Sequence, residues 1–194
     1  MKLCIFAGTF NPIHNAHIKM AEYVSDEFGF DKILFIPAYK PPHKDYDISY
    51  SQHRYNMVEL AVTDNDKFDI SDIEFNRDSK SYTYITIQNL YKKYDLDEKI
   101  NFIIGTDAFS KIESWYETDK LKGLIEFIVF VRQNEKADFT GLMQKGYKFK
   151  FANMDFVDIS STEVRDKIKS NEDISDLVPK KVKEYIEKYG LYKN

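Results

Sequence analysis

Two histidines near the start of the chain stand three residues apart, in the segment Gly8-Thr9-Phe10-Asn11-Pro12-Ile13-His14-Asn15-Ala16-His17. A predicted helix begins within this segment, so His14 and His17 would lie on one face of its first turn. That turn presents unpaired N–H groups and positive potential, which suit a phosphate. Two imidazoles there can donate hydrogen bonds to phosphate oxygens and become cationic as charge develops. The alternative is that His14 caps the loop and His17 packs in the core.

A second motif with phosphate-binding chemistry lies far along the chain, at Ile159-Ser160-Ser161-Thr162-Glu163-Val164-Arg165. Its serines and threonine would present hydroxyl and N–H groups at a second helix N-terminus, with Arg165 within one turn of Thr162. Taken singly, the motif is also an ordinary N-cap. Two such helix starts in one protein favour a triphosphate site. Because the first loop is neither GxGxxG nor a lysine-bearing phosphate loop, neither a dehydrogenase nor a kinase is indicated.

The elements that must position these loops are predicted from apolar runs and helical spacing. Four strands buried on both faces are predicted from mainly apolar segments, at residues 3–7, 33–36, 101–104 and 126–131. Between the first two, apolar residues at helical spacing predict a helix that ends at Gly29. Alternating strands and helices with short connections predict an α/β fold with a doubly wound parallel sheet. We expect one domain over residues 1–194, with a small helical part from about residue 160 to 194.

The remaining elements are predicted from weaker patterns. Ser49 and Gln52 resemble a capping box for a helix over about residues 50–63. Helices are also expected near residues 84–94 and 138–144, and two more close the chain, the last starting at Pro179. Short strands are expected near residues 68–70, 73–75, 149–151 and 156–159.

Composition limits the classes of function. The chain has 194 residues, of which 43% are hydrophobic and 31% charged, as in an ordinary globular domain. Its net charge is −4 and it has no basic tract, so nucleic acid is not an expected partner. The single cysteine, Cys4, excludes an internal disulfide and makes a structural zinc site unexpected. No run approaches the roughly 20 apolar residues of a membrane span, and no secretory signal stands out, so a cytoplasmic location is expected.

Together the two loops resemble the signatures of the nucleotidyltransferase superfamily, whose HxxH-type and ISSTxxR loops bind ATP. Nearly end to end, the chain resembles the bacterial nicotinate mononucleotide adenylyltransferases. Further segments stand in that family's order: Lys40-Pro41-Pro42-His43-Lys44, Glu74 with Arg77, Ser81-Tyr82-Thr83, Gly105-Thr106-Asp107, Trp115-Tyr116, Arg132 and Gly190-Leu191-Tyr192. The chain departs from the family's usual glycine at Ala7 and Ala16, and from its frequent aspartate at Asn11.

The resemblance implies a Rossmann-like nucleotidyltransferase fold and adenylyl transfer from ATP to nicotinate mononucleotide, giving deamido-NAD and pyrophosphate in NAD biosynthesis. It implies His14, His17 and Arg165 as the catalytic group. The ATP-binding residues it implies are Gly8, Thr9, Phe10, His14, His17, Lys44, Ser160, Ser161, Thr162 and Arg165. For nicotinate mononucleotide they are Thr83, Asp107, Trp115, Tyr116 and Arg132, with the Trp115 ring stacked on the pyridine and backbone N–H groups of Thr83 and Tyr116 receiving its carboxylate.

No protein metal site is implied, because Mg²⁺ would arrive on the ATP phosphates. The expected partners are the two substrates, without nucleic acid or membrane; a homo-oligomer remains possible. Two alternatives stay open. One is a sister transferase acting on phosphopantetheine, a cytidylyl acceptor or nicotinamide mononucleotide, against which the middle of the chain argues. The other is a non-catalytic nucleotide sensor, which would not need His14, His17 and Arg165 together.

Overall fold

A six-stranded parallel sheet forms the centre of the computed structural model, which describes residues 1–42, 48–76, 80–131, 137–154 and 159–193. The strand order is β3-β2-β1-β4-β5-β6, and every neighbouring pair is parallel. This confirms the doubly wound parallel sheet. Ligands bind such sheets at the carboxyl ends of the strands where the order reverses, here beside β1 and β4. The strands are β1 (Leu3–Gly8), β2 (Lys32–Pro37), β3 (Phe68–Ile70), β4 (Ile100–Gly105), β5 (Ile125–Phe130) and β6 (Phe149–Ala152).

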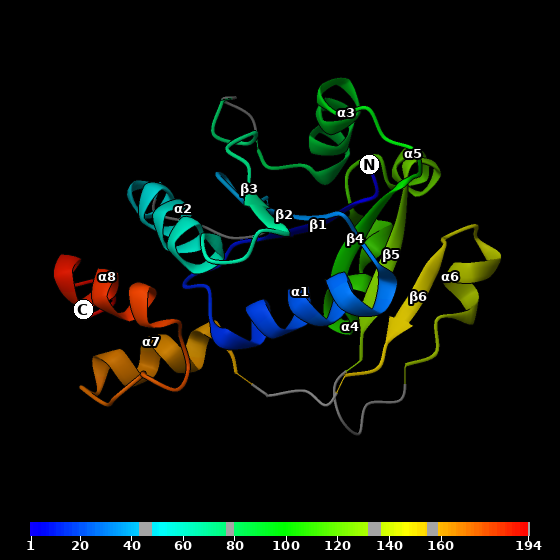
Figure 1. The fold of residues 1–194 in the computed structure, drawn as a ribbon. Coiled ribbons are helices and arrows are strands. Elements are labelled where there is room, and N and C mark those ends of the chain that lie inside the picture. Colours follow the sequence, from blue (N-terminus) through cyan, green and yellow to red (C-terminus); the bar gives the residue numbers. More distant parts are fainter. Residues whose placement is uncertain (43–47, 77–79, 132–136, 155–158, 194) are drawn as a thin grey trace.

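Helices cover both faces of the sheet (Figure 1), which explains why the strands are continuous apolar runs. Successive side chains of β1 alternate between two cores: Cys4 and Phe6 join one, Leu3 and Ile5 the other. The first core is closed by α1 (Asn15–Phe28), α2 (Ser49–Val62), α7 (Ser161–Lys169) and α8 (Lys180–Tyr189). The second is closed by α3 (Thr83–Lys93), α4 (Thr106–Phe109), the 3₁₀ turn η1 (Ile112–Ser114), α5 (Thr118–Leu124) and α6 (Thr140–Gln144).

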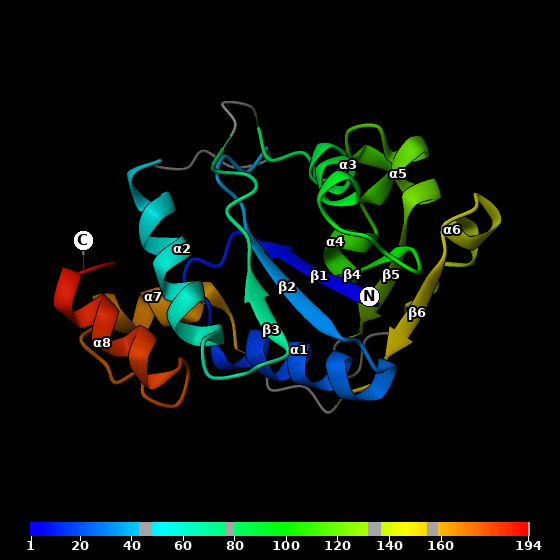
Figure 2. The ribbon, with the colours of Figure 1, turned by 45° about the horizontal axis from the view of Figure 1, so that its top comes forward.

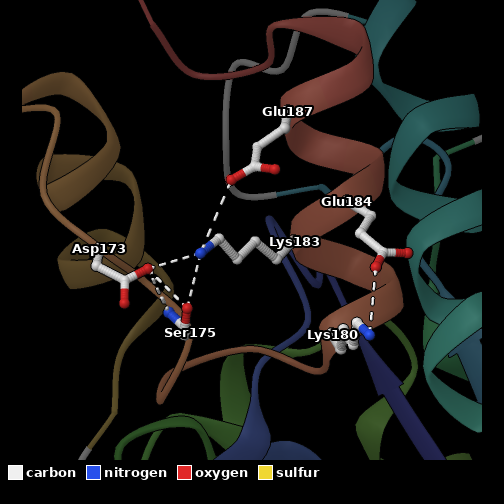
Figure 3. Close-up of polar contacts among 6 residues, drawn as sticks. All are labelled: Asp173, Ser175, Lys180, Lys183, Glu184 and Glu187. Atoms are coloured by element: carbon white, nitrogen blue, oxygen red, sulfur yellow. Dashed lines mark hydrogen bonds and ion pairs between the residues drawn. The ribbon is translucent and has the colours of Figure 1, made fainter.

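Of the two closing helices predicted from the sequence, α8 packs against α2 at one end of the sheet (Figure 2). The Tyr185 hydroxyl of α8 lies 2.9 Å from His53 Nδ1 and accepts a hydrogen bond from Asn56 Nδ2, both on α2. Lys183 of α8 donates to Asp173 and Ser175 in the connection between α7 and α8 (Figure 3). The C-terminal helices are therefore fixed to the body of the protein.

Some local predictions were wrong. Residues 73–75 form a turn rather than a strand: Phe75 N donates to Asp72 O, and the buried Glu74 carboxylate accepts from the Thr86 hydroxyl. Ser49 is the first residue of α2 rather than its cap, so the predicted capping box does not form. Ile159 is not in a strand, and residues 155–158 of that predicted strand lie outside the described residues. Within the described part of the chain, no helix is both long enough and apolar enough to cross a membrane.

Candidate active site

The first loop leaves β1 at Gly8 and turns into α1. A Cβ at Gly8 would lie 3.2 Å from the Phe10 ring, so glycine allows that ring to pack against the strand end. Phe10 is 3% exposed, and its ring meets the rings of Phe6 and His17 edge-on, at centroid distances of 5.4 and 5.1 Å. The Phe10 side chain thus belongs to the core.

His14 and His17 form a stacked pair at the start of α1. Their ring centroids are 3.6 Å apart, with an interplanar angle of 22°. The backbone N–H of His14 donates to His17 Nδ1 at 3.2 Å. Because Nδ1 accepts, a neutral His17 ring must carry its proton on Nε2, which makes Nε2 a donor. His14 Nδ1 is buried, and no hydrogen-bond partner is found for it among the described residues.

Both histidines are neutral near neutral pH in the free protein. Burial lowers the pKa of His14 from 6.5 to about 4. Burial, and secondly the neighbouring His14, lower the pKa of His17 well below 6.5. An anion bound beside the pair would raise both pKa values, because opposite charge favours the protonated ring. The pair can therefore donate hydrogen bonds first and gain positive charge as negative charge accumulates on a bound phosphate.

The structure brings the second motif against the first loop. Ser161 Oγ donates to the Pro12 carbonyl at 2.9 Å, and Arg165 Nη1 donates to the Asn11 carbonyl at 2.8 Å. Arg165 Nη2 also donates to Thr162 Oγ1 at 3.2 Å. Ser160 is the N-cap of α7, since its hydroxyl accepts from Glu163 N. Two helix N-termini, remote in sequence, thus lie side by side.

A cavity of about 220 Å³ opens next to the first loop. Three of the residues expected to bind nicotinate mononucleotide line it, namely Thr83, Trp115 and Tyr116. The other lining residues are Ala7, Gly8, Thr9, Ile36, Ala38, Pro41, Pro42, Glu74, Ser81, Tyr82 and Phe102. Because Gly8 and Thr9 also belong to the first loop, the cavity adjoins the loop that carries the two histidines.

Aromatic rings make the walls of this cavity. The Trp115 ring meets Phe102 edge-on, with centroids 5.8 Å apart. The Tyr116 ring lies 4.6 Å from that of Tyr82, at an interplanar angle of 30°, and Tyr116 is 48% exposed. Thr83 is the first residue of α3, where backbone amides have no acceptor within the helix. Flat apolar walls with an open helix N-terminus suit a planar ring that carries an anionic group.

Comparison with known proteins matches this arrangement to a family. Residues 5–167 match a family model described as cytidylyltransferase-like. A probable nicotinate-nucleotide adenylyltransferase of Clostridium tetani is 43% identical over 99% of both chains. The nicotinate-nucleotide adenylyltransferase of Bacillus subtilis is 38% identical over 100% of this chain and 99% of its own. The chain belongs to the nicotinate-nucleotide adenylyltransferase family.

Solved structures agree with this family membership. The Plasmodium falciparum nicotinic acid mononucleotide adenylyltransferase complexed with NaAD is 25% identical, with a TM-score of 0.81 over 98% of this chain and 96% of its own. The same enzyme complexed with APC has a TM-score of 0.79 at 25% identity, over 99% and 98% of the two chains. The Rossmann-like nucleotidyltransferase fold expected from the sequence is thereby confirmed.

Of the other residues implied by the family resemblance, Asp107 is not among the described residues that line the cavity. Asp107 is exposed on α4, directly after β4. Lys44 and Arg132 lie outside the described residues. Lys40 lies in the loop after β2, and its backbone N–H donates to Ser81 Oγ at 3.1 Å. This hydrogen bond joins that loop to the segment before α3.

Sequence reasoning missed Arg54, which holds the loops after β1 and β2 together. Its side chain is completely buried; Nη1 donates to the Thr9 carbonyl at 2.7 Å and Nη2 to Ser51 Oγ at 3.1 Å. Ser51 Oγ donates in turn to the Tyr39 carbonyl at 3.0 Å. The loops after β1 and β2 are thus joined through one guanidinium. An arginine three residues before the core residue Met57 was the available signal, since it falls on the buried side of the helix.

Proposed function

We propose that this chain transfers the adenylyl group of ATP to nicotinate mononucleotide, giving deamido-NAD and pyrophosphate, a step of NAD biosynthesis. The observation that carries the proposal is that two regions of different chemistry adjoin at the first loop. A histidine pair and two helix N-termini suit a triphosphate, and an aromatic cavity that begins at the same loop suits a pyridine ring. A sensor or a transferase for an aliphatic acceptor has no need of that cavity.

At the triphosphate end, the chain would act by donating hydrogen bonds and charge. His14 and His17 would meet the phosphates, together with backbone N–H groups of Gly8, Thr9 and Phe10. The N-terminal residues of α7, Ser160, Ser161 and Thr162, would hold the triphosphate from the other side with Arg165. Lys44 would add a cation. As charge builds on the α-phosphate oxygens, the His17 Nε2–H bond strengthens and the ring is drawn toward its cationic form.

The reaction itself needs no base from the protein. A 5′-phosphate oxygen of the mononucleotide attacks the α-phosphorus of ATP, the bond from that phosphorus to the bridging oxygen breaks, and pyrophosphate leaves with its electron pair. A phosphate dianion is already a competent nucleophile. The protein therefore contributes by placing the two anions in line and by neutralising developing charge.

At the acceptor end, the pyridine ring would lie in the aromatic cavity. Trp115 would stack on the ring, and the backbone N–H groups of Thr83 and Tyr116 would receive the nicotinate carboxylate. Asp107 would accept from a ribose hydroxyl, and Arg132 would add positive charge. The carboxylate would accept hydrogen bonds from both N–H donors. The amide of nicotinamide would turn its own NH₂ toward one of these donors, and neither group would then have an acceptor.

Magnesium enters this scheme as part of the substrate MgATP. No group of three or more histidine, cysteine, aspartate or glutamate side chains in the described residues is placed to hold a metal ion. Mg²⁺ prefers oxygen ligands and usually binds through substrate phosphates. The imidazole pair of His14 and His17 does not fit Mg²⁺.

We further propose that the reaction takes place in the cytoplasm.

The test compares acceptors side by side, measuring pyrophosphate release with ATP and nicotinate mononucleotide, nicotinamide mononucleotide or phosphopantetheine. Nicotinate mononucleotide should have the highest kcat/KM, and the amide should be at least about tenfold worse, because an unpaired buried donor pair costs about 1–3 kcal/mol. Charge-assisted bonds to the acid widen the difference. Equal use of the two mononucleotides would overturn the nicotinate assignment. Binding of ATP without pyrophosphate release would favour a sensor.

A further inference from the structure

Asn11, in the middle of the first loop, is held at two atoms by the C-terminal part of the chain. The Tyr192 hydroxyl donates to Asn11 Oδ1 at 2.7 Å, and Arg165 Nη1 donates to the Asn11 backbone carbonyl at 2.8 Å. The next carbonyl, of Pro12, accepts from Ser161. Tyr192 after α8 and the α7 residues Ser161 and Arg165 thus converge on two adjacent residues of the first loop, Asn11 and Pro12.

The backbone of Tyr192 adopts an unusual conformation. Its φ is +64°, in the left-handed region that a bulky side chain rarely adopts. The chain reaches it through Gly190, the left-handed C-cap of α8. The reversal turns Tyr192 inward: it is 7% exposed, and its ring lies 5.7 Å from that of Tyr50 on α2. A residue keeps a strained backbone conformation only where its surroundings hold it there. The hydroxyl of Tyr192 contacts the first loop at Asn11.

We propose that Tyr192 is a positioning residue for ATP, an inference that rests on the proposed function. Its hydroxyl fixes the Asn11 side chain, and Arg165 fixes the Asn11 carbonyl. The loop that carries His14 and His17 is then ordered before ATP arrives. Ordering a loop in advance lowers the entropy cost of binding and keeps the donors in place for the transition state. This hydrogen bond does not shape the acceptor cavity, because Tyr192 and Asn11 are not among the residues that line it.

Tyr192→Phe tests the proposal, because it removes one hydroxyl and keeps the ring. We expect KM for ATP to rise about tenfold, the usual effect of losing one such buried hydrogen bond. KM for nicotinate mononucleotide should stay within about twofold, and the melting temperature within about 4 °C. Tyr185→Phe is the matched control. Its hydroxyl also binds a neighbouring helix, through His53 and Asn56, and no contact joins it to the first loop. It should leave KM for ATP unchanged.

The partner residue provides a second, independent variant. Asn11→Leu removes the acceptor, so adding Tyr192→Phe to it should raise KM for ATP no further. Asn11→Asp keeps an acceptor oxygen, so adding Tyr192→Phe to Asn11→Asp should still raise KM for ATP. Additive effects of Asn11→Leu and Tyr192→Phe, or equal increases in KM for both substrates, would overturn the proposal.

Binding of a non-hydrolysable ATP analogue, measured by calorimetry, separates this inference from the proposed function. If the wild type binds the analogue but releases no pyrophosphate with any acceptor, the proposed function fails and the Tyr192 comparison can still be made. If the wild type turns over and Tyr192→Phe binds the analogue as tightly as the wild type does, the positioning role fails alone.

Discussion

The two ends of the site are built by different forces. At the triphosphate end, side chains and carbonyls are held by directed hydrogen bonds from α2, α7 and the segment after α8. At the acceptor end, the cavity is shaped by ring packing among Phe102, Trp115, Tyr82 and Tyr116, and one of these rings is about half exposed. Fixed donors are what a transition state with developing charge requires, whereas shape is enough to bind a planar ring. Changes at the first end should therefore lower the rate, and changes at the second should weaken acceptor binding.

The largest expected effect is that of His17→Ala. The variant loses the proposed Nε2 donor to the reacting phosphate, and one preorganised donor of this kind typically contributes about 10²–10³ in kcat. KM for nicotinate mononucleotide should change little. The measurement is steady-state pyrophosphate release, with a thermal melt of the same variant. His53→Ala is the control, since His53 bonds to Tyr185 of α8 and not to the loop. A His17→Ala enzyme with near wild-type kcat would make His17 a packing residue for Phe6 and Phe10.

Trp115→Ala should have an intermediate effect and act on the other end of the site. Loss of ring stacking typically weakens binding by about 1–3 kcal/mol, so KM for both mononucleotides should rise about tenfold or more. The preference for the acid over the amide should persist, because it resides in the backbone donors of Thr83 and Tyr116. Trp115→Phe keeps a flat ring and should recover most of the loss. If Trp115→Ala raises KM for ATP as strongly as KM for the acceptor, the two ends are not separable.

The smallest expected effect is that of Lys183→Met on the surface of the C-terminal helices (Figure 3). The Lys183 hydrogen bond, followed by those of Ser175, lowers the pKa of the exposed Asp173 carboxyl below 3.8. Since the folded-state pKa lies below the unfolded one, this stabilisation is fully present above about pH 4 and is lost as the pH falls through the folded-state pKa.

Lys183→Met should accordingly lower the melting temperature by no more than about 2–4 °C near neutral pH, because exposed ion pairs contribute little. The difference from the wild type should shrink in acid and at high ionic strength. KM for ATP should not change. A change in that KM as large as the one expected for Tyr192→Phe would mean that the whole C-terminal part, rather than the Tyr192 hydroxyl, supports the first loop.

Much of the fold could be predicted because its signals are local. The four long strands are buried on both faces, so each is mainly apolar, and α1 ends at a left-handed Gly29 as expected. The segments that escaped prediction lack such signals. The short helices α4 and α5 and the 3₁₀ turn between β4 and β5 are too brief to show a period. The turn at residues 73–75 depends on a side-chain contact between Glu74 and Thr86, which no local pattern encodes.

Residue types and their spacing along the chain set which groups are available and how groups within one helical turn lie relative to each other. His14 and His17 share a helix face because they stand three residues apart, and Ser160 caps α7 because a hydroxyl before a helix reaches its third amide. The partners that these groups contact follow instead from how distant segments pack together. Tyr192 and Arg165 bind Asn11 across 181 and 154 residues of chain, and Arg54 reaches Thr9 across 45. Such contacts depend on β1 lying between β2 and β4, an order set by packing of the whole sheet and not by any segment alone.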